Sequence, residues 1–231
     1  MPGILYVIST PIGNLKDTTL RALETLKQVD LIACEDTRHT QKLLFHYEIH
    51  KPMTSLFEHN ERKKVPELIR QLEEGKTIGL VSDAGTPGIS DPGFVLIREA
   101  IRHNIPVVPI PGPSALTTAL TVSGLPTDRF TFEGFLPQKS GGRRRKLEQL
   151  KNEERTMIFF ESPHRLLKTL QEMLEIWGDV WVVCARELTK LHESALRQSL
   201  SQQIAHFKQQ APRGEIVLVV NLKTAASALT K

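Results

Sequence analysis

The segment from Ser82 to Gly93, SDAGTPGISDPG, holds the residues best suited to bind a small ligand. It follows the apolar run 77–81, and its glycines and prolines end that strand, so we expect the loop at the carboxyl edge of a sheet. Open α/β sheets bind ligands at that edge. The loop contains Asp83 and Asp91 and no Lys or Arg, whereas a phosphate-binding loop normally supplies a lysine. These residues favour a neutral or cationic ligand with hydroxyl groups over a polyphosphate.

Two further features of this loop leave alternatives open. Asp91 and Pro92 match a helix N-cap followed by proline at the first helical position, so Asp91 serves equally well as a cap, whereas Asp83 is expected to touch the ligand. A tight turn without a ligand uses the same residue types.

The run from Lys139 to Lys146, KSGGRRRK, places five basic residues within eight. The two adjacent glycines predict a flexible loop, and an arginine cluster in such a loop attracts a phosphodiester backbone. The alternative is a solvated loop without a partner. The residues expected to contact RNA under the first interpretation are Arg143, Arg144, Arg145 and Lys146.

The first half of the chain alternates short apolar runs with amphipathic helical periods. The apolar runs predict five strands, over residues 3–8, 31–34, 53–57, 77–81 and 107–110. The segments between them predict helices, among them one over 65–72 and one from about Pro92 to His103. Helical crossovers return the chain in the same direction, so we expect a mostly parallel sheet in an N-terminal α/β domain of residues 1–111.

Residues 112–231 are expected to form a second α/β domain. Gly112 and Pro113 are placed to cap and start a helix of small side chains, and Ser162 and Pro163 repeat that pattern. The predicted strands cover 130–135, 156–161, 180–185 and 215–221, and the predicted helices lie near 143–151, 163–176 and 201–209. Loops that follow strands in both domains, at 9–14, 82–93, 112–115 and 161–164, are expected to meet in one cleft.

Composition sets broad limits on the class of protein. The chain has 231 residues, 40% of them apolar, which is enough for a sizeable core, and its net charge of +4 is mild. No apolar run approaches the roughly 18 residues of a membrane span and no secretory signal opens the chain, so we expect a soluble, cytoplasmic protein. Cys34 and Cys184 lie in separate apolar runs, and the eight histidines lack the spacing of metal ligands, so no metal is expected.

Seven segments, in order along the chain, together resemble one known family. They are STPIGNL (9–15), EDTRHT (35–40), SDAGTPGISDPG, PGPSA (111–115), FFESPHR (159–165), RELTKLHE (186–193) and RGEIVLVV (213–220). This set closely resembles the tetrapyrrole-methylase superfamily of S-adenosylmethionine-dependent, class III methyltransferases, over essentially the whole chain. Within it, the chain looks like the branch that methylates the ribose 2′-hydroxyl of a cytidine in the decoding centre of 16S ribosomal RNA.

The resemblance implies two α/β domains with S-adenosylmethionine in the cleft between them, held largely by backbone groups. It carries over Pro11, then Ser82, Asp83, Ala84 and Gly85, then Ser114 and Ala115, and from the second domain Phe159, Phe160 and Pro212. Asp83 is expected to favour the positive sulfonium or to bind hydroxyls, and N–H groups near Ser114 suit the methionine carboxylate. The alternative for the two phenylalanines is the core.

Methyl transfer to a ribose hydroxyl is an in-line displacement, in which the enzyme aligns the nucleophile and helps to remove its proton. Polar residues at strand ends are the candidates: Asp36 or His59 for proton removal or hydroxyl orientation, and Arg38 and Lys190 for RNA phosphate.

Structural roles are the alternatives at these strand ends. For Glu35 and Asp36 the alternative is capping of a helix over 37–45, and for Arg186 and Glu187 it is an ion pair. Glu161, His164 and Arg165 are an analogous capping and packing cluster.

The implied partners are 16S ribosomal RNA or the assembled 30S subunit, together with a second copy of the chain in a homodimer. Members of this branch usually continue into a small helical domain, whereas this sequence stops at Lys231, so we expect part of the RNA-binding surface to lie outside it. The alternatives are a methylase acting on a tetrapyrrole or a protein residue, and a non-catalytic RNA-binding factor. The basic run favours a polyanionic substrate, and the intact glycine-rich loops argue against a non-catalytic factor.

Overall fold

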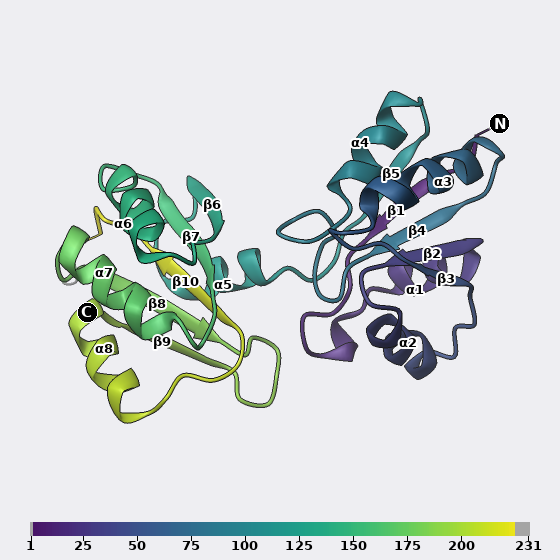
Figure 1. The fold of residues 1–231 in the computed structure, drawn as a ribbon. Helices are drawn as coiled ribbons and strands as arrows, with labels where there is room; N and C mark the ends of the chain where they lie inside the picture. Colours follow the sequence, from purple (N-terminus) through teal and green to yellow (C-terminus); the bar gives the residue numbers. More distant parts are fainter. Residues whose placement is uncertain (1, 225–231) are drawn as a thin grey trace. The chain divides into compact units, whose positions relative to one another are not determined.

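The computed structural model describes residues 2–224 of the chain. The chain divides into two compact units, Met1–Ser114 and Ala115–Lys231, each with its own five-stranded sheet (Figure 1). Within residues 2–224, no helix combines the length and the apolar character needed to cross a membrane.

The first unit alternates strands and helices along the chain. Its elements are β1 (Leu5–Ile8), the 3-10 helix η1 (Leu15–Asp17), α1 (Leu20–Gln28), β2 (Leu31–Cys34), α2 (Thr37–His46), β3 (Met53–Ser55), α3 (Glu61–Glu73), β4 (Ile78–Val81), α4 (Phe94–Arg102) and β5 (Val107–Ile110). The sheet order is β3-β2-β4-β1-β5, and all four strand pairs are parallel. The prediction of a parallel sheet joined by helices is confirmed.

Alternate residues of these strands enter two separate cores, because successive side chains point to opposite faces of a sheet. Leu5 and Leu80 pack with α3 and α4, whereas Ile8 and Ile32 pack with α1 and α2. The helices therefore cover both faces of the sheet (Figure 1). The strand order reverses between β4 and β1, the kind of position at which open α/β sheets bind ligands.

Helix α4 begins later than the sequence indicates. It starts at Phe94 with Gly93 as its N-cap, and Gly93 adopts a φ of 122°, a conformation that favours glycine. The N–H of Gly93 donates to Oε1 of Glu61 at 2.8 Å. The expectation that Asp91 and Pro92 cap and start this helix is therefore wrong.

The second unit is built on a mixed sheet. Its elements are α5 (Ala115–Ser123), β6 (Phe130–Phe135), α6 (Ser140–Gln149), β7 (Thr156–Glu161), α7 (Leu166–Trp177), β8 (Trp181–Arg186), β9 (Ser194–Ser199), α8 (Leu200–Gln209) and β10 (Ile216–Val220). The sheet order is β6-β7-β10-β8-β9; only β6 and β7 run parallel. Strand β9 was not predicted, because its sequence SALRQS is polar on an edge strand and lacks an apolar run.

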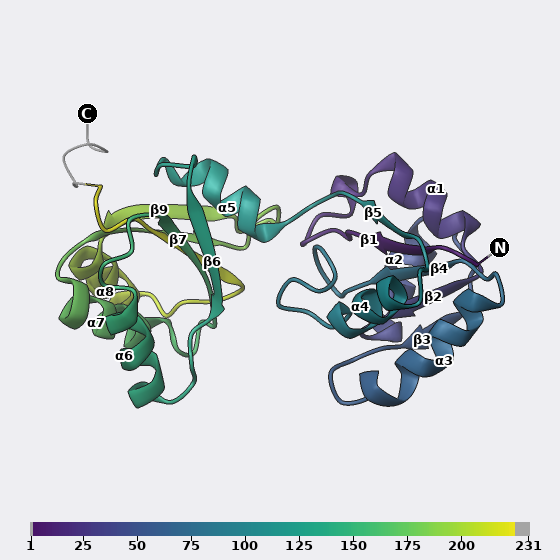
Figure 2. The ribbon, with the colours of Figure 1, turned by 90° about the horizontal axis from the view of Figure 1, so that it is seen from above.

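Helices α6, α7 and α8 cover one face of the second sheet, and α5 lies on the other (Figure 2). Leu147, Leu170 and Phe207 bring the three helices onto a core formed with Met157 and Leu218.

Three expected helix starts differ from the observed ones. The helix predicted near 143–151 is confirmed as α6, but it begins at Ser140. Gly141 and Gly142 lie in its first turn, so the prediction of a flexible loop around them is wrong. Helix α5 begins at Ala115, after Gly112 and Pro113. Helix α7 begins at Leu166 with Arg165 as its N-cap, and Ser162 and Pro163 form the turn before it.

Candidate functional site

The loops after β1 and β4 are joined where the strand order reverses. Thr10 and Gly85 exchange two backbone hydrogen bonds, with N···O distances of 2.9 and 3.0 Å. The hydroxyl of Thr10 also donates to the carbonyl oxygen of Ser82 at 3.1 Å, and the hydroxyls of Ser9 and Thr86 lie 2.9 Å apart. The two loops therefore form one rigid edge of the first unit.

Glycine is favoured at two positions of this edge. Gly85 has a φ of 80°, which L side chains rarely adopt. Gly112, after β5, lies so close to Ser9 that an added Cβ would sit 3.0 Å from the Ser9 Cβ. The loop after β5 is thus packed against the loop after β1.

Three carboxylates gather beside this edge. Oδ1 of Asp83 accepts the backbone N–H of Asp36 at 3.1 Å. Burial and then the charge of Asp83 raise the pKa of Glu35. Burial, followed by the charge of Glu35, raises the pKa of Asp91 to about 6, although a hydrogen bond from Ser82 opposes the shift. The negative charge of this group is therefore only partly compensated by the surrounding protein.

Asp36 acts as a structural residue. It is the N-cap of α2, accepting the N–H of Arg38 at 2.8 Å, and its other oxygen pairs with the Arg38 guanidinium at 2.8 Å. Hydrogen bonds from Arg38 lower the pKa of Asp36 to about 2. The capping alternative is therefore confirmed, and the Asp36 carboxylate is already engaged by the backbone and the guanidinium of Arg38.

The other residues of the first unit that sequence analysis singled out have varied exposure. Pro11, Ser82 and Gly85 are buried, Asp83 and Ser114 are half-buried, and Ala84 is exposed. Because the backbone of Gly85 is bonded to Thr10, and the hydroxyl of Ser82 donates to the Ala84 carbonyl at 3.3 Å, Gly85 and Ser82 shape the loop.

His59 and Arg38 are exposed at the carboxyl ends of β3 and β2. His59 lies in the turn before α3, its ring edge-on to that of Phe57 with centroids 6.4 Å apart. The side chain of Arg38 is 87% exposed, although it pairs with Asp36.

In the second unit, the two phenylalanines of β7 point to opposite faces. Phe159 is 0% exposed and packs with Trp177 in the core under the helices, so its assignment to the cofactor is wrong. Phe160 is half-buried on the other face, among Phe132 and Phe135. Pro212 is half-buried in the segment before β10, and Ala115 is the first residue of α5.

Lys190 forms ion pairs with two glutamates. Its Nζ lies 3.1 Å from Oε1 of Glu187 and 3.2 Å from Oε2 of Glu215. Burial lowers the pKa of Lys190, but the two carboxylates outweigh it and raise the pKa overall. The ion pair between Arg186 and Glu187, given as the structural alternative, does not form. Glu187 pairs with Lys190 instead, and the Arg186 guanidinium lies over the Phe207 ring, 5.8 Å from its centroid.

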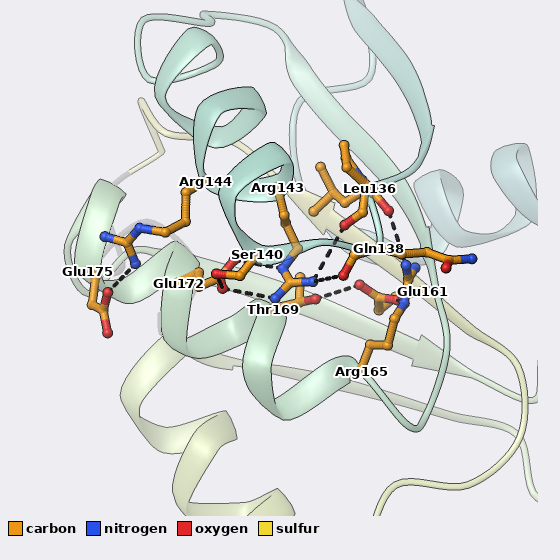
Figure 3. A network of polar contacts seen from close by, with 11 residues as sticks. Leu136, Gln138, Ser140, Arg143, Arg144, Glu161, Arg165, Thr169, Glu172 and Glu175 are labelled. Atoms are coloured by element: carbon orange, nitrogen blue, oxygen red, sulfur yellow. Dashed lines mark hydrogen bonds and ion pairs between the residues drawn. The ribbon is translucent and has the colours of Figure 1, made fainter.

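The basic residues of α6 differ in their contacts, and Figure 3 shows those of Arg143 and Arg144. Arg143 is 3% exposed; its Nε donates to Glu172 Oε2 at 2.6 Å and its Nη2 to Oε1 at 2.8 Å. Arg144 pairs with Glu175 of α7, and Lys146 pairs with Glu133 of β6 at 2.7 Å. Arg145 is exposed and forms no ion pair within residues 2–224. Buried Arg143 is therefore excluded as an RNA contact. Of the four basic residues, Arg145 is the one best placed to contact RNA.

A second part of the same network surrounds Glu161 (Figure 3). The carboxylate accepts from Arg165 Nε at 2.9 Å and from the Thr169 hydroxyl at 2.6 Å, and Arg165 Nη1 donates to the Leu136 carbonyl at 3.1 Å. These bonds hold α7 and the end of β6 onto β7, as the packing alternative predicts.

Comparisons with known proteins agree along nearly the whole chain. The family model for Tetrapyrrole (Corrin/Porphyrin) Methylases matches residues 4–203. The chain belongs to the tetrapyrrole methylase family. It is 52% identical to the "Ribosomal RNA small subunit methyltransferase I" of Thermotoga maritima, over 96% of this chain and 99% of the relative. It is 53% identical to the protein of that name from Synechocystis sp., over 94% of this chain and 78% of the relative.

The fold of this tetrapyrrole methylase also matches solved structures. A crystal structure of diphthine synthase superposes with a TM-score of 0.76 at 17% identity, covering 97% of this chain and 92% of the other. At this identity the likeness shows the fold alone, and it confirms the α/β class expected from the sequence.

The family implies S-adenosylmethionine as methyl donor, and the residues of this tetrapyrrole methylase fit such a ligand. Asp83, Glu35 and Asp91 place three carboxyl groups together, and burial followed by their mutual repulsion raises the pKa of Glu35 and Asp91; a cationic ligand would relieve that repulsion. Among the described residues, no group of three or more His, Cys, Asp or Glu side chains is placed to hold a metal ion. In the sequence, Glu35 is one of several polar residues at a strand end; no local pattern indicates that it lies partly buried beside Asp83 and Asp91.

Proposed function

We propose that this chain transfers a methyl group from S-adenosylmethionine to the ribose 2′-hydroxyl of a cytidine in the decoding centre of small-subunit ribosomal RNA. The observation that carries the proposal is sequence similarity. Over nearly its whole length, the chain is 52–53% identical to relatives named ribosomal RNA small subunit methyltransferase I. The residues of the joined loops after β1 and β4, with their neighbouring carboxylates, support S-adenosylmethionine as the cofactor.

Within the first unit, the proposed cofactor residues divide into two kinds. Asp83, with Glu35 and Asp91 beside it, supplies negative charge for the sulfonium or acceptors for ribose hydroxyls. Thr10 and Gly85 hold the loop in place through their paired backbone bonds. The bound cofactor supplies a methyl group made electrophilic by the positive sulfur.

The protein has to orient the attacking hydroxyl and give its proton a path to an acceptor. Asp36 is already committed to α2 and Arg38. We therefore assign hydroxyl orientation or proton removal to His59, which is exposed after β3. Arg38, Lys190 and Arg145 are the proposed phosphate contacts.

The first experiment tests the cofactor. Titration calorimetry of the purified chain with S-adenosylmethionine should give saturable binding, and Asp83→Asn should weaken it by about tenfold or more, because the variant loses a charge next to a cation. Asp17→Asn, also in the first unit but on η1, is the matched control and should bind normally. Absence of binding at millimolar cofactor would reject the proposal.

The second experiment tests the acceptor. We expect label from methyl-labelled S-adenosylmethionine to enter assembled 30S subunits or free 16S RNA. Because a 2′-O-methyl group removes the nucleophile of alkaline cleavage, the labelled nucleotide should resist alkali. Label on a base, on protein or on a tetrapyrrole would contradict the assignment.

The third experiment tests His59 in the same assay. His59→Gln should lower kcat without changing cofactor affinity, whereas His50→Gln, an exposed histidine before β3, should leave both unchanged. Equal activity of the two variants would remove His59 from the mechanism.

The proposed setting follows from this function. The partner is the 30S subunit or its RNA, the place is the cytoplasm, and the protein acts as a homodimer. Light scattering of the purified chain checks the last point.

A further inference from the structure

Strand β6 presents a cluster of aromatic rings at the edge of the second sheet. The Phe160 ring centroid lies 4.8 Å from that of Phe132 and 5.6 Å from that of Phe135, each pair inclined at 65°. Such edge-to-face contacts hold aromatic rings in fixed orientations. Phe135 is nevertheless 55% exposed. The cluster therefore offers a braced aromatic surface to a partner.

A β-bulge creates this cluster. Phe132 pairs with Ile158 and Phe135 with Phe160, so one extra residue lies in β6 between Phe132 and Gly134. Without the bulge, residues three apart on a strand would point to opposite faces. With it, both phenylalanines share the face of Phe160, while Glu133 turns to Lys146 of α6. The bulge thus separates the aromatic face from the basic helix.

The helices of the second unit leave this part of the sheet open. Helices α6, α7 and α8 cover the opposite face, and α5 packs against β8, β9 and β10. Strand β6 is also an edge strand. Figure 2 shows α5 on one side of the sheet and the other three helices on the opposite side.

Two exposed cations lie beyond the two ends of β6 along the chain. Arg129 precedes the strand and Lys139 follows it by four residues; both are exposed. Neither side chain forms an ion pair within residues 2–224, in contrast with Arg144 and Lys146. Exposed aromatic rings between unpaired cations match single-stranded nucleic acid, whose bases stack on the rings while its phosphates meet the cations.

We propose that the cluster of Phe132, Phe135 and Phe160 is a stacking platform for an unpaired base of the RNA substrate, with Arg129 and Lys139 on phosphates of neighbouring nucleotides along the same strand of RNA. The inference rests on the proposed function for the identity of the RNA. Phe135 makes the stacking contact, and Phe160 and the bulge hold its ring in position. Phe160 is thereby reassigned from the cofactor to the substrate.

The decisive test compares Phe135→Leu with Phe135→Trp in the full chain. Loss of the ring should weaken binding of 30S subunits, and of a single-stranded RNA oligonucleotide, by about tenfold, the usual scale for one stacked base. The tryptophan variant should keep affinity, and its fluorescence should be quenched when the oligonucleotide is added. Cofactor affinity by calorimetry should not change in either variant.

Three controls make the result interpretable. Phe45→Leu removes an exposed ring from α2 of the first unit and should not affect RNA binding. Thermal melts check that the variants fold, and Arg129→Gln with Lys139→Gln should reduce the salt dependence of binding by about one phosphate contact each.

The contrary outcomes point to different errors. A loss of cofactor affinity in Phe135→Leu would assign the cluster to the cofactor, and a change from dimer to monomer would assign it to a second copy of the chain. Either result overturns the platform, as does unchanged RNA binding. If the wild-type chain binds RNA through Phe135 but transfers no methyl group, the platform stands and the proposed function fails.

Discussion

The guanidinium of Arg143 is buried against the carboxylate of Glu172, with Nε and Nη2 donating to its two oxygens at 2.6 and 2.8 Å. Two residues further on, Arg145 is exposed and unpaired within the described chain. A step of two residues, about 200° around α6, thus separates an arginine that stabilises the fold from one that can contact a substrate.

Replacement of these two arginines should separate stability from binding. Arg143→Ala leaves the Glu172 carboxylate buried without its partner and should cost about 3–5 kcal/mol of unfolding free energy. Arg145→Ala should change stability by less than about 0.5 kcal/mol, weaken RNA binding and lower its salt dependence. Urea unfolding and RNA titrations at several salt concentrations measure both effects. Equal destabilisation by the two variants would contradict the assignment.

Gly214 and Gly141 should respond to alanine in opposite directions. Gly214 has a φ of 79°, and an added Cβ would lie 2.3 Å from the carboxyl group of Glu187, which holds Lys190 and the N–H of Glu215. Gly214→Ala should cost about 1–3 kcal/mol. Gly141 lies in α6 with no atom within 4 Å of an added Cβ, so Gly141→Ala should stabilise by about 0.5–1 kcal/mol. Denaturant unfolding gives the sign of each change.

Asp91 should make stability depend on pH between about 4 and 6. Its pKa is raised from 3.8 in the unfolded chain to about 6 in the fold, so in this window the folded protein holds a proton that the unfolded chain has lost. Stability therefore falls as the pH rises through the window. Asp91→Asn should remove that part of the slope and raise the melting temperature at pH 7. A variant with the wild-type slope would show that Asp91 does not titrate there.

The same carboxylate should couple cofactor binding to pH. A cationic ligand favours the ionised form of Asp91, so affinity for S-adenosylmethionine should weaken as the pH falls from 7.5 to 5. S-adenosylhomocysteine lacks the sulfonium charge and should show a weaker dependence. Calorimetry with both ligands, on the wild type and on Asp91→Asn, measures the difference. An identical pH dependence for the two ligands would place the carboxylates away from the sulfonium.

Asp36 should behave as a helix cap. Asp36→Ser keeps an acceptor for the Arg38 N–H and should preserve both stability and kcat, whereas Asp36→Ala should lower the melting temperature. Because the pKa of Asp36 is depressed to about 2, its stabilisation is present above pH 4 and is lost as the pH falls through 2. A large loss of kcat in a stably folded Asp36→Ser protein would restore the catalytic role.

Much of the fold was predictable because it depends on local signals. Apolar runs such as 31–34 and 107–110 coincide with β2 and β5, and amphipathic periods mark α1 and α3. The seven ordered motifs identified the family before any contact was known. Strand β9 was not predicted, because an edge strand needs few apolar residues.

The sequence by itself therefore determined the alternation of strands and helices, the family, and the acidic glycine-rich loop after β4 that is proposed to bind the cofactor. Only the tertiary structure decided which side chains remain available for function. It buried Arg143 and Phe159, committed Asp36 to a helix cap, and brought Glu35 next to Asp91. The reason is physical: residue type and periodicity are local, whereas burial and charge depend on partners such as Glu172, 29 residues from Arg143 along the chain.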